Sequence, residues 1–482
     1  GLGDVYKRQE INKMKKSLLA GAIAAAILNP AQAEFLTGGH NWNTGSASPL
    51  YANFPITLSG YSGSSKNSVS YKGQMARHAL HNSLKKLVSK GSKADMMAYY
   101  AGKGKDRIII DPATKGDFKI KQTTIGELSD KNLKGKTYKG MVPGWVGNMT
   151  GVEVAEFMID KAANAKGGVD LANGYNYSQL VSKFLMGAIF YNQAADNYLD
   201  EKLEANTKPN NKAYKPGKAY TGKEHVWDEA FGYFGAPAHA LTLTAKQVYG
   251  IAKKKDMAAA DFNKDGVVDL YTEMTYAHGY YAASFDKGGK TNYFNNVVQA
   301  YLDGRNLLVA SGANILSNAE RSKLKGYANT IKSNWEKVIA ESVFKYAGEV
   351  YEDIAKINTI LGNNGDVKKA YQKYVKHWGE MKGFALALQV GGKDLGETAV
   401  KLNRLAGFGP VILGDTQVKS LDANGDYVQG ASGSLEGYML HMLKIQNLMV
   451  KQFDVKARSH DQTAGLANLV KSLGVKASAE ND

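Results

Sequence analysis

The densest group of chemically useful side chains lies in EHVWDEAFGYFGAP, residues 224–237, with one histidine, three carboxylates and four aromatic residues. If this stretch is helical, His225 shares a face with Asp228 and Glu229, which follow it by about one turn. An imidazole and a carboxylate on one turn can supply two ligands of a transition-metal site, such as iron or zinc. Two ligands do not close such a site, so core packing of the aromatic residues is the alternative interpretation.

A weaker copy of this pattern occurs later in HWGEMKGF, where His377 and Glu380 are again one helical turn apart. Aligning Trp227 with Trp378 also brings a glutamate and a glycine of the two segments into register. An internal duplication would explain the match, and two copies could bring two histidine and carboxylate pairs together. We therefore expect His377 and Glu380 to contribute to the same metal site as residues 225–229.

A second candidate site is the acidic segment DFNKDGVVDLYTE, residues 261–273. Its spacing resembles an EF-hand loop, with oxygen ligands at positions 1, 3, 5 and 9, a carbonyl at 7 and a glycine at 6. Position 12 is Thr272, and the carboxylate comes one place later, so either residue could be the last ligand. The alternative is a solvated acidic turn that begins a helix. The pattern predicts structural calcium, with the ligands Asp261, Asn263, Asp265, Val267, Asp269 and Glu273.

Common enzyme signatures are absent from the sequence. It lacks an HExxH zinc-peptidase helix, a GxSxG nucleophile elbow, a GxxxxGK[ST] phosphate loop and any cysteine. These absences argue against an enzyme, although carboxylates and histidines could still carry acid–base chemistry.

The charge balance of the chain favours anionic partners. The 482 residues include 61 Lys and Arg against 45 Asp and Glu, a formal net charge of +16. Acidic glycans and phosphates of a cell envelope would suit such a surface. The lysines are dispersed rather than clustered, so we expect no nucleic-acid partner.

The beginning of the chain predicts export. Residues 1–13 precede the first methionine and are interpreted as a translation artefact. Residues 14–33 combine two lysines, a short apolar run and small residues, as signal peptides do. No later apolar run reaches the ~20 residues of a transmembrane helix. We therefore expect a periplasmic or secreted protein, without lipid anchor or disulfide because cysteine is absent.

The rest of the chain predicts an all-α fold with helices packed as bundles. Apolar residues recur at three- and four-residue spacing in 177–199, 318–357, 371–388 and 435–453, whereas alternating strand patterns are scarce. We divide the chain into an irregular arm, 34–69, a first helical half, 70–255, a calcium-type loop, 256–275, and a second helical half, 276–482.

Five segments together resemble one bacterial family. In chain order they are YKGQMARHALHNSL, KEHVWDEAFGYFG, DFNKDGVVDLYTE, YLDGRNLL and KHWGEMKGFALALQ. The sequence is similar to exported proteins defined only as domain-of-unknown-function family 4856, which are related to imelysin-like proteins. This resemblance implies an all-helical fold of two related bundle-like halves.

The imelysin-like relation also implies a function. Such proteins are associated with iron acquisition, and some have been classed as metallopeptidases around a GxHxxE motif. Here one extra residue separates Gly222 from His225, and Asp228 stands where that motif has glutamate. We therefore expect an exported metal-binding protein for a metal ion or iron complex, with structural calcium. The alternatives are a metal-dependent hydrolase that uses the same residues, and a calcium-stabilised adhesion or glycan-binding protein that uses the aromatic residues in 40–54.

Overall fold

The computed structural model describes residues 50–474. Most of these residues are helical, and their strands form only two small two-stranded sheets. The predicted all-α class is therefore confirmed. The segments 1–13 and 14–33 and the first part of the arm 34–69 lie outside the described residues. No helix within 50–474 is both long and apolar enough to cross a membrane.

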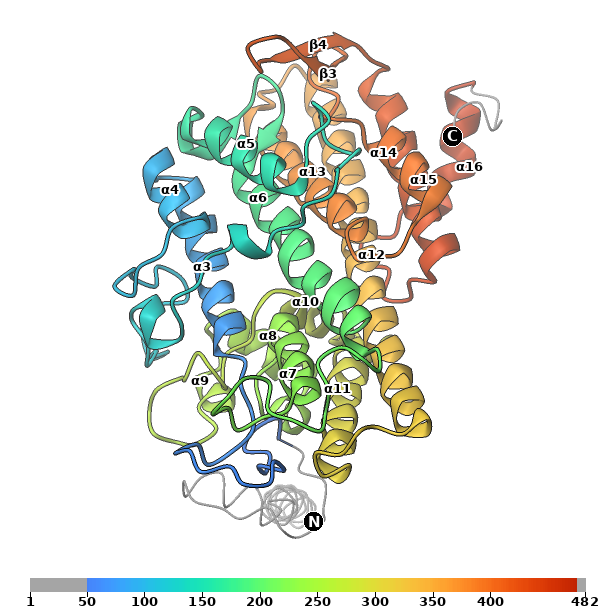
Figure 1. Ribbon diagram of the computed structural model, residues 1–482. Helices are drawn as coiled ribbons and strands as arrows, with labels where there is room; N and C mark the ends of the chain where they lie inside the picture. Colours follow the sequence, from blue (N-terminus) through green and yellow to red (C-terminus); the bar gives the residue numbers. More distant parts are fainter. Residues whose placement is uncertain (1–49, 475–482) are drawn as a thin grey trace, which may run out of the picture.

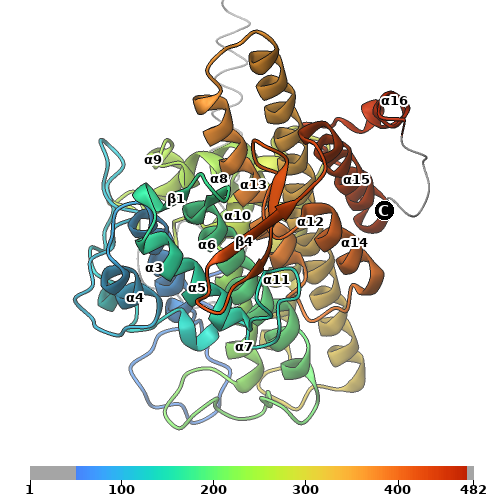
Figure 2. The same cartoon turned by 90° about the horizontal axis from the view of Figure 1, so that it is seen from above.

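Two antiparallel ladders interrupt the helices. The first joins β1 (Val169–Asp170) to β2 (Tyr175–Asn176). The second is a hairpin of β3 (Thr416–Leu421) and β4 (Tyr427–Ala431), whose register runs from Thr416 opposite Ala431 to Leu421 opposite Tyr427. Figures 1 and 2 place this hairpin at the end of the molecule where α5 and α14 lie.

The first half of the described chain contributes short and medium helices around the site. They are α3 (Lys72–Val88), α4 (Lys93–Tyr100), α5 (Gly151–Ala163), α6 (Tyr177–Leu185), α7 (Gly222–Phe234), α8 (Ala245–Ala252), α9 (Met257–Ala260) and α10 (Ala277–Asp286). The helix α6 continues without a break into the wider π-helical turns of η4 (Met186–Tyr198).

The second half contributes longer helices. They are α11 (Tyr293–Ala310), α12 (Asn318–Gly362), α13 (Lys368–Leu388), α14 (Gly396–Ala406), α15 (Leu435–Phe453) and α16 (Leu466–Ser472). The 45-residue α12 extends from the region of α11 to that of α15 and packs mainly against α11, α13 and α15 (Figure 1).

Single 3-10 turns connect several of these helices. They are η1 (Ile125–Glu127), η2 (Lys134–Lys136), η3 (Lys166–Gly168), η5 (Glu201–Leu203), η6 (Ala240–Thr242) and η7 (Thr463–Gly465).

Local sequence sets where the helices begin and end. Thr221 caps α7, Ser317 caps α12 and Ser434 caps α15, each by accepting a hydrogen bond from a backbone amide in the first turn. Gly235 ends α7 with a φ of +86°, a conformation that favours glycine. The apolar faces of these helices meet in one continuous core.

Candidate functional site: a lysine-lined cavity

The stretch 224–237 forms α7, and its two fully buried carboxylates bind an arginine. Arg305 of α11 donates through Nη1 to Glu224 Oε1 at 2.8 Å and through Nε to Asp228 Oδ1 at 3.0 Å. Burial raises the pKa of the Asp228 carboxyl to about 6, although the Arg305 guanidinium opposes this shift. Asp228, predicted as a metal ligand, is therefore part of a buried ion-pair network.

The same network fixes the arm before α3. Arg305 Nη2 donates to the Ser68 carbonyl at 3.1 Å and to its hydroxyl at 2.6 Å. Tyr51 donates its hydroxyl to Asp228 Oδ1 at 2.8 Å, and the Ser70 amide donates to Oδ2 at 3.1 Å. These bonds attach residues 51–70 to α7 and α11.

His225 and Glu229 come together as predicted, on another face of α7. The imidazole Nε2 lies 3.7 Å from Glu229 Oε2, and the ring stacks on Tyr220 at 4.5 Å between centroids. Glu229 Oε1 accepts a bond from Gln74 Nε2 at 2.9 Å. Burial lowers the pKa of His225, although Glu229 opposes this shift.

His377 and Glu380 lie on α13, and their polar neighbours differ from those of His225. His377 Nδ1 lies 2.7 Å from Asp353 Oδ2, and Nε2 lies 4.0 Å from Glu349 Oε2. Glu380 Oε1 lies 3.8 Å from Lys183 Nζ. Within residues 50–474 no group of three or more His, Cys, Asp or Glu side chains is arranged to hold a metal ion.

The acidic segment 261–273 forms a tight loop whose carboxylates bind its own backbone. Asp261 accepts bonds from the amides of Asp265, at 3.1 Å, and Gly266, at 2.9 Å. Asp265 Oδ1 accepts from the Val267 amide at 3.1 Å, and Asn263 Oδ1 accepts from the Asp265 amide at 2.9 Å. Gly266 has a φ of +84°, as the sharp turn requires.

The end of this loop brings Glu273 back towards its beginning. Glu273 is 1 % exposed, and its carboxylate accepts bonds from the amides of Phe262 and Asn263 through Oε1 and from that of Asp269 through Oε2. Asp269 itself accepts from Gln122 Nε2 at 2.8 Å. The two possible last ligands were Thr272 and Glu273. Of these, Glu273 returns its side chain to the beginning of the loop.

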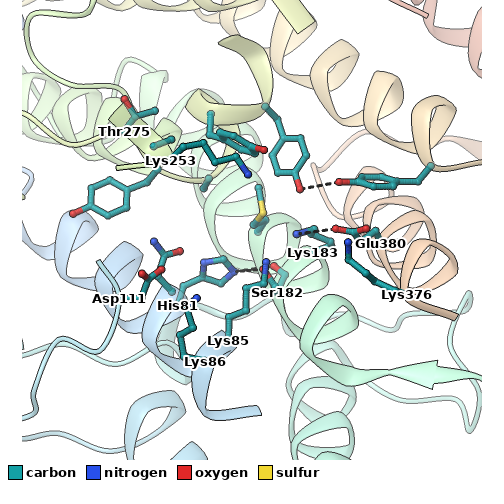
Figure 3. Close-up of a pocket in the computed structure, with 18 of the residues that line it drawn as sticks. His81, Lys85, Lys86, Asp111, Ser182, Lys183, Lys253, Thr275, Lys376 and Glu380 are labelled. Atoms are coloured by element: carbon teal, nitrogen blue, oxygen red, sulfur yellow. Dashed lines mark hydrogen bonds and ion pairs between the residues drawn. The ribbon is translucent and has the colours of Figure 1, made fainter. Parts of the chain in front are cut away.

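A cavity of about 390 Å³ lies between α3, α6, α10, α12 and α13 (Figure 3). Its polar lining is dominated by lysines, namely Lys85, Lys86, Lys183, Lys253, Lys345 and Lys376. The carboxylates that line it are Asp111, Glu349 and Glu380. Four tyrosines and two histidines also line it, namely Tyr276, Tyr280, Tyr281, Tyr346, His81 and His377. Lysines thus outnumber carboxylates two to one in this wall.

Two amines of this wall lie side by side. Lys183 of α6 is 3 % exposed, and its amine interacts directly with that of Lys85 on α3. Burial lowers the pKa of Lys183 well below its ordinary value, and the positive charge of Lys85 lowers it further. Burial also lowers the pKa of Lys85, while Glu380 raises the pKa of both amines. Figure 3 shows the pairing of Lys183 with Glu380.

Three buried histidines lie on α3 and α10, and one of them, His81, lines the cavity. His81 Nε2 lies 2.8 Å from the Ser182 carbonyl, and His78 Nε2 lies 2.9 Å from that of Gly232. Burial lowers the pKa of His78 to about 3 and that of His81 to about 4. Burial lowers the pKa of His278 as well, and the two other imidazoles add to this shift. All three are therefore neutral at pH 7.

The fold and the cavity define a helical protein with a pocket lined mainly by lysines. Residues 158–389 match the family model described as Domain of unknown function (DUF4856). This match confirms the predicted relation to that domain family, and it spans Lys183, Glu380, α7 and the acidic loop. No curated protein and no solved structure matches the chain significantly.

Proposed function

We propose that the protein binds a small anionic ligand through the lysines of the central cavity. The supporting observation is the adjacent pair Lys85 and Lys183, for which Glu380 is the one carboxylate that raises both pKa values. A buried amine beside a second amine loses its proton easily, so a bound anion stabilises the protonated form of the pair. Carboxylate or phosphate oxygens are the groups that lysines bind as point charges.

The positive charge of the cavity also determines which form of a metal we expect it to bind. A free metal cation would be repelled by the surrounding ammonium groups, whereas an anionic chelate would be attracted. We therefore propose that any iron ligand of this cavity is a chelate with carboxylate or phosphate groups. Export through residues 14–33, an imelysin-like relation and a role in iron acquisition are parts of the same proposal.

Two related halves remain part of the proposal as well. Trp227 and Trp378, on which the repeat was aligned, are both fully buried in helices. Trp227 Nε1 donates to the Tyr301 carbonyl and Trp378 Nε1 to the Tyr438 hydroxyl, each at 2.7 Å. Burial and a hydrogen bond at both indoles support a duplication.

Calorimetric titration at low salt tests the anion site with inorganic phosphate, citrate and ferric citrate as probes. Lys85→Met and Lys183→Met are expected to weaken binding of the preferred probe by about tenfold or more, because each removes a charge-assisted contact. Lys90→Met, at an exposed position just after α3, is the matched control and should change little. Absence of binding by all three probes, or equal effects of Lys85→Met and Lys90→Met, would overturn the proposal.

A structural calcium ion in the loop 261–273 is a second proposed role. It is supported by the convergence of Asp261, Asn263 and Asp265 on one turn and by the return of Glu273 to its beginning. Calcium should raise the Tm of the wild type and of the exposed control Asp106→Ala, but not that of Asp265→Ala. Equal Tm values of the wild type in calcium and in chelator would contradict this role.

A further inference from the structure

The amine of Lys183 has the surroundings of a nucleophile. It lies on the wall of the cavity, 3.8 Å from Glu380 and next to the amine of Lys85. A lysine attacks a carbonyl group only as the neutral amine, and desolvation beside a second cation is the arrangement that produces this form near pH 7. Lys183 is both buried and next to a second cation.

The charged and titratable groups around Lys183 come from several helices. Burial and the neighbouring Lys85 lower its pKa, Lys376 acts in the same direction, and Glu380 opposes them. The ring of Tyr281 lies 5.5 Å from Nζ and also favours the cation. Burial and two cations therefore favour the neutral amine, while one carboxylate and one ring favour the cation. The titratable groups that line the cavity with Lys183 include His81 and Lys85 from α3, Tyr281 from α10, Tyr346 from α12, and Lys376 and Glu380 from α13.

We infer that Lys183 forms an imine with an aldehyde or ketone that also carries an anionic group, as 2-oxo acids do. This inference rests on the proposed anion binding, because the remaining lysines would hold the carboxylate or phosphate of such a ligand. It assigns to the cavity a covalent capture step in addition to reversible binding.

The step needs no oxidant or reductant. The lone pair of Nζ attacks the carbonyl carbon and forms a C–N bond, while the carbonyl oxygen takes up a proton. The amine loses its protons, for which Glu380 is the carboxylate within reach, and the hydroxyl leaves as water. The products are the imine and one water molecule.

Reductive trapping with glyoxylate tests the inference on the full chain. Cyanoborohydride transfers hydride to the imine carbon and leaves a stable carboxymethylated lysine, which peptide mass spectrometry locates. At pH 7 Lys183 should be modified about tenfold faster than exposed Lys90, because a lower pKa increases the neutral fraction. Modification of Lys183 no faster than that of Lys90 would overturn the inference.

Variants separate this inference from the anion site on which it rests. Lys183→Arg keeps a positive charge, so it should still bind citrate but lose the rapid adduct. Lys85→Met should shift the pH profile of Lys183 labelling to higher pH, because the neighbouring cation is gone. Citrate binding without a rapid adduct in the wild type would defeat the imine alone, whereas loss of both would defeat the proposed function too.

The anionic group of the probe is tested separately. Acetaldehyde carries the aldehyde without the carboxylate, so its preference for Lys183 over Lys90 should be smaller than that of glyoxylate. Glycolate carries the carboxylate without the aldehyde and should slow the labelling by glyoxylate. An equal preference with acetaldehyde would overturn the requirement for an anionic group.

Discussion

Arg305 donates through Nε to Asp228 Oδ1 at 3.0 Å, and both side chains are completely buried. The pair joins α11 to α7, while a second bond from Arg305 reaches Glu224 one turn earlier. An arginine cannot lose its charge in a protein, so its burial depends on these carboxylates. The concentration of carboxylates in α7 therefore has a structural explanation.

Replacing Arg305 should destabilise the protein strongly. Arg305→Met leaves Glu224 and Asp228 buried without their cation, which costs about 3–5 kcal/mol in comparable cases. Urea denaturation measures the change in the free energy of unfolding. Arg321→Met, at a half-buried position near the start of α12, is the control and should cost under about 1 kcal/mol. Similar losses in the two variants would contradict the importance of the buried pair.

The buried histidines predict loss of stability in acid. The pKa of His78 is about 3 in the folded protein, below its ordinary value of 6.5. The folded chain therefore binds fewer protons than the unfolded chain between these values, and stability falls as the pH falls through this window. Each such histidine contributes at most about 1.4 kcal/mol per pH unit.

His78→Gln should make this pH dependence shallower, because glutamine does not titrate and can still donate to the Gly232 carbonyl. Chemical denaturation at several values between pH 7 and pH 4.5 provides the slope. An unchanged slope would show that His78 is not the source of the acid sensitivity.

Lys85→Met should stabilise the ligand-free protein while it weakens anion binding. The substitution removes one of two adjacent amines with unfavourable burial, and a gain of about 0.5–1 kcal/mol is typical of relieved strain at a binding site. Thermal unfolding in buffer without phosphate or citrate provides the measurement. If the variant is less stable than Lys90→Met, repulsion between the amines is not a significant cost.

Two helical glycines should respond in opposite ways to alanine. A Cβ on Gly304 of α11 would overlap the Trp227 ring, so Gly304→Ala should cost about 1–3 kcal/mol. A Cβ on Gly326 of α12 would meet nothing within 4 Å, so Gly326→Ala should gain up to about 1 kcal/mol. Equal shifts in denaturation midpoint for the two variants would mean that α7 and α11 can move apart to accommodate the new Cβ without a loss of stability.

The long helices were predictable because the spacing of apolar residues within each helix indicates its buried face. α12, α13 and α15 bury one face, and the three- and four-residue spacing of that face is visible in the sequence. Ser434 directly precedes this spacing in α15 and caps the helix. The small hairpins were not anticipated, since strands of two to six residues contain too few alternations to form a pattern.

The candidate site was harder to predict from the sequence than the long helices were. His225 and Glu229 do form a pair, but Asp228, one residue earlier, points to another neighbour because successive helical residues are rotated by about 100°. Lys85 and Lys183 meet through packing of α3 against α6, which sequence spacing does not encode. One feature could have identified Lys183, since it is the only charged residue between Asp170 and Asp196.

The attachment of the arm sets the order in which the fold can be completed. Tyr51 binds a carboxylate 177 positions later, and Ser68 binds a guanidinium 237 positions later. A chain synthesised from its N-terminus leaves the arm without these partners until Arg305 has emerged. Docking of the arm is therefore a late, long-range event. Residues 51–70 are synthesised before α7 and α11, but they can bind only after those helices are present.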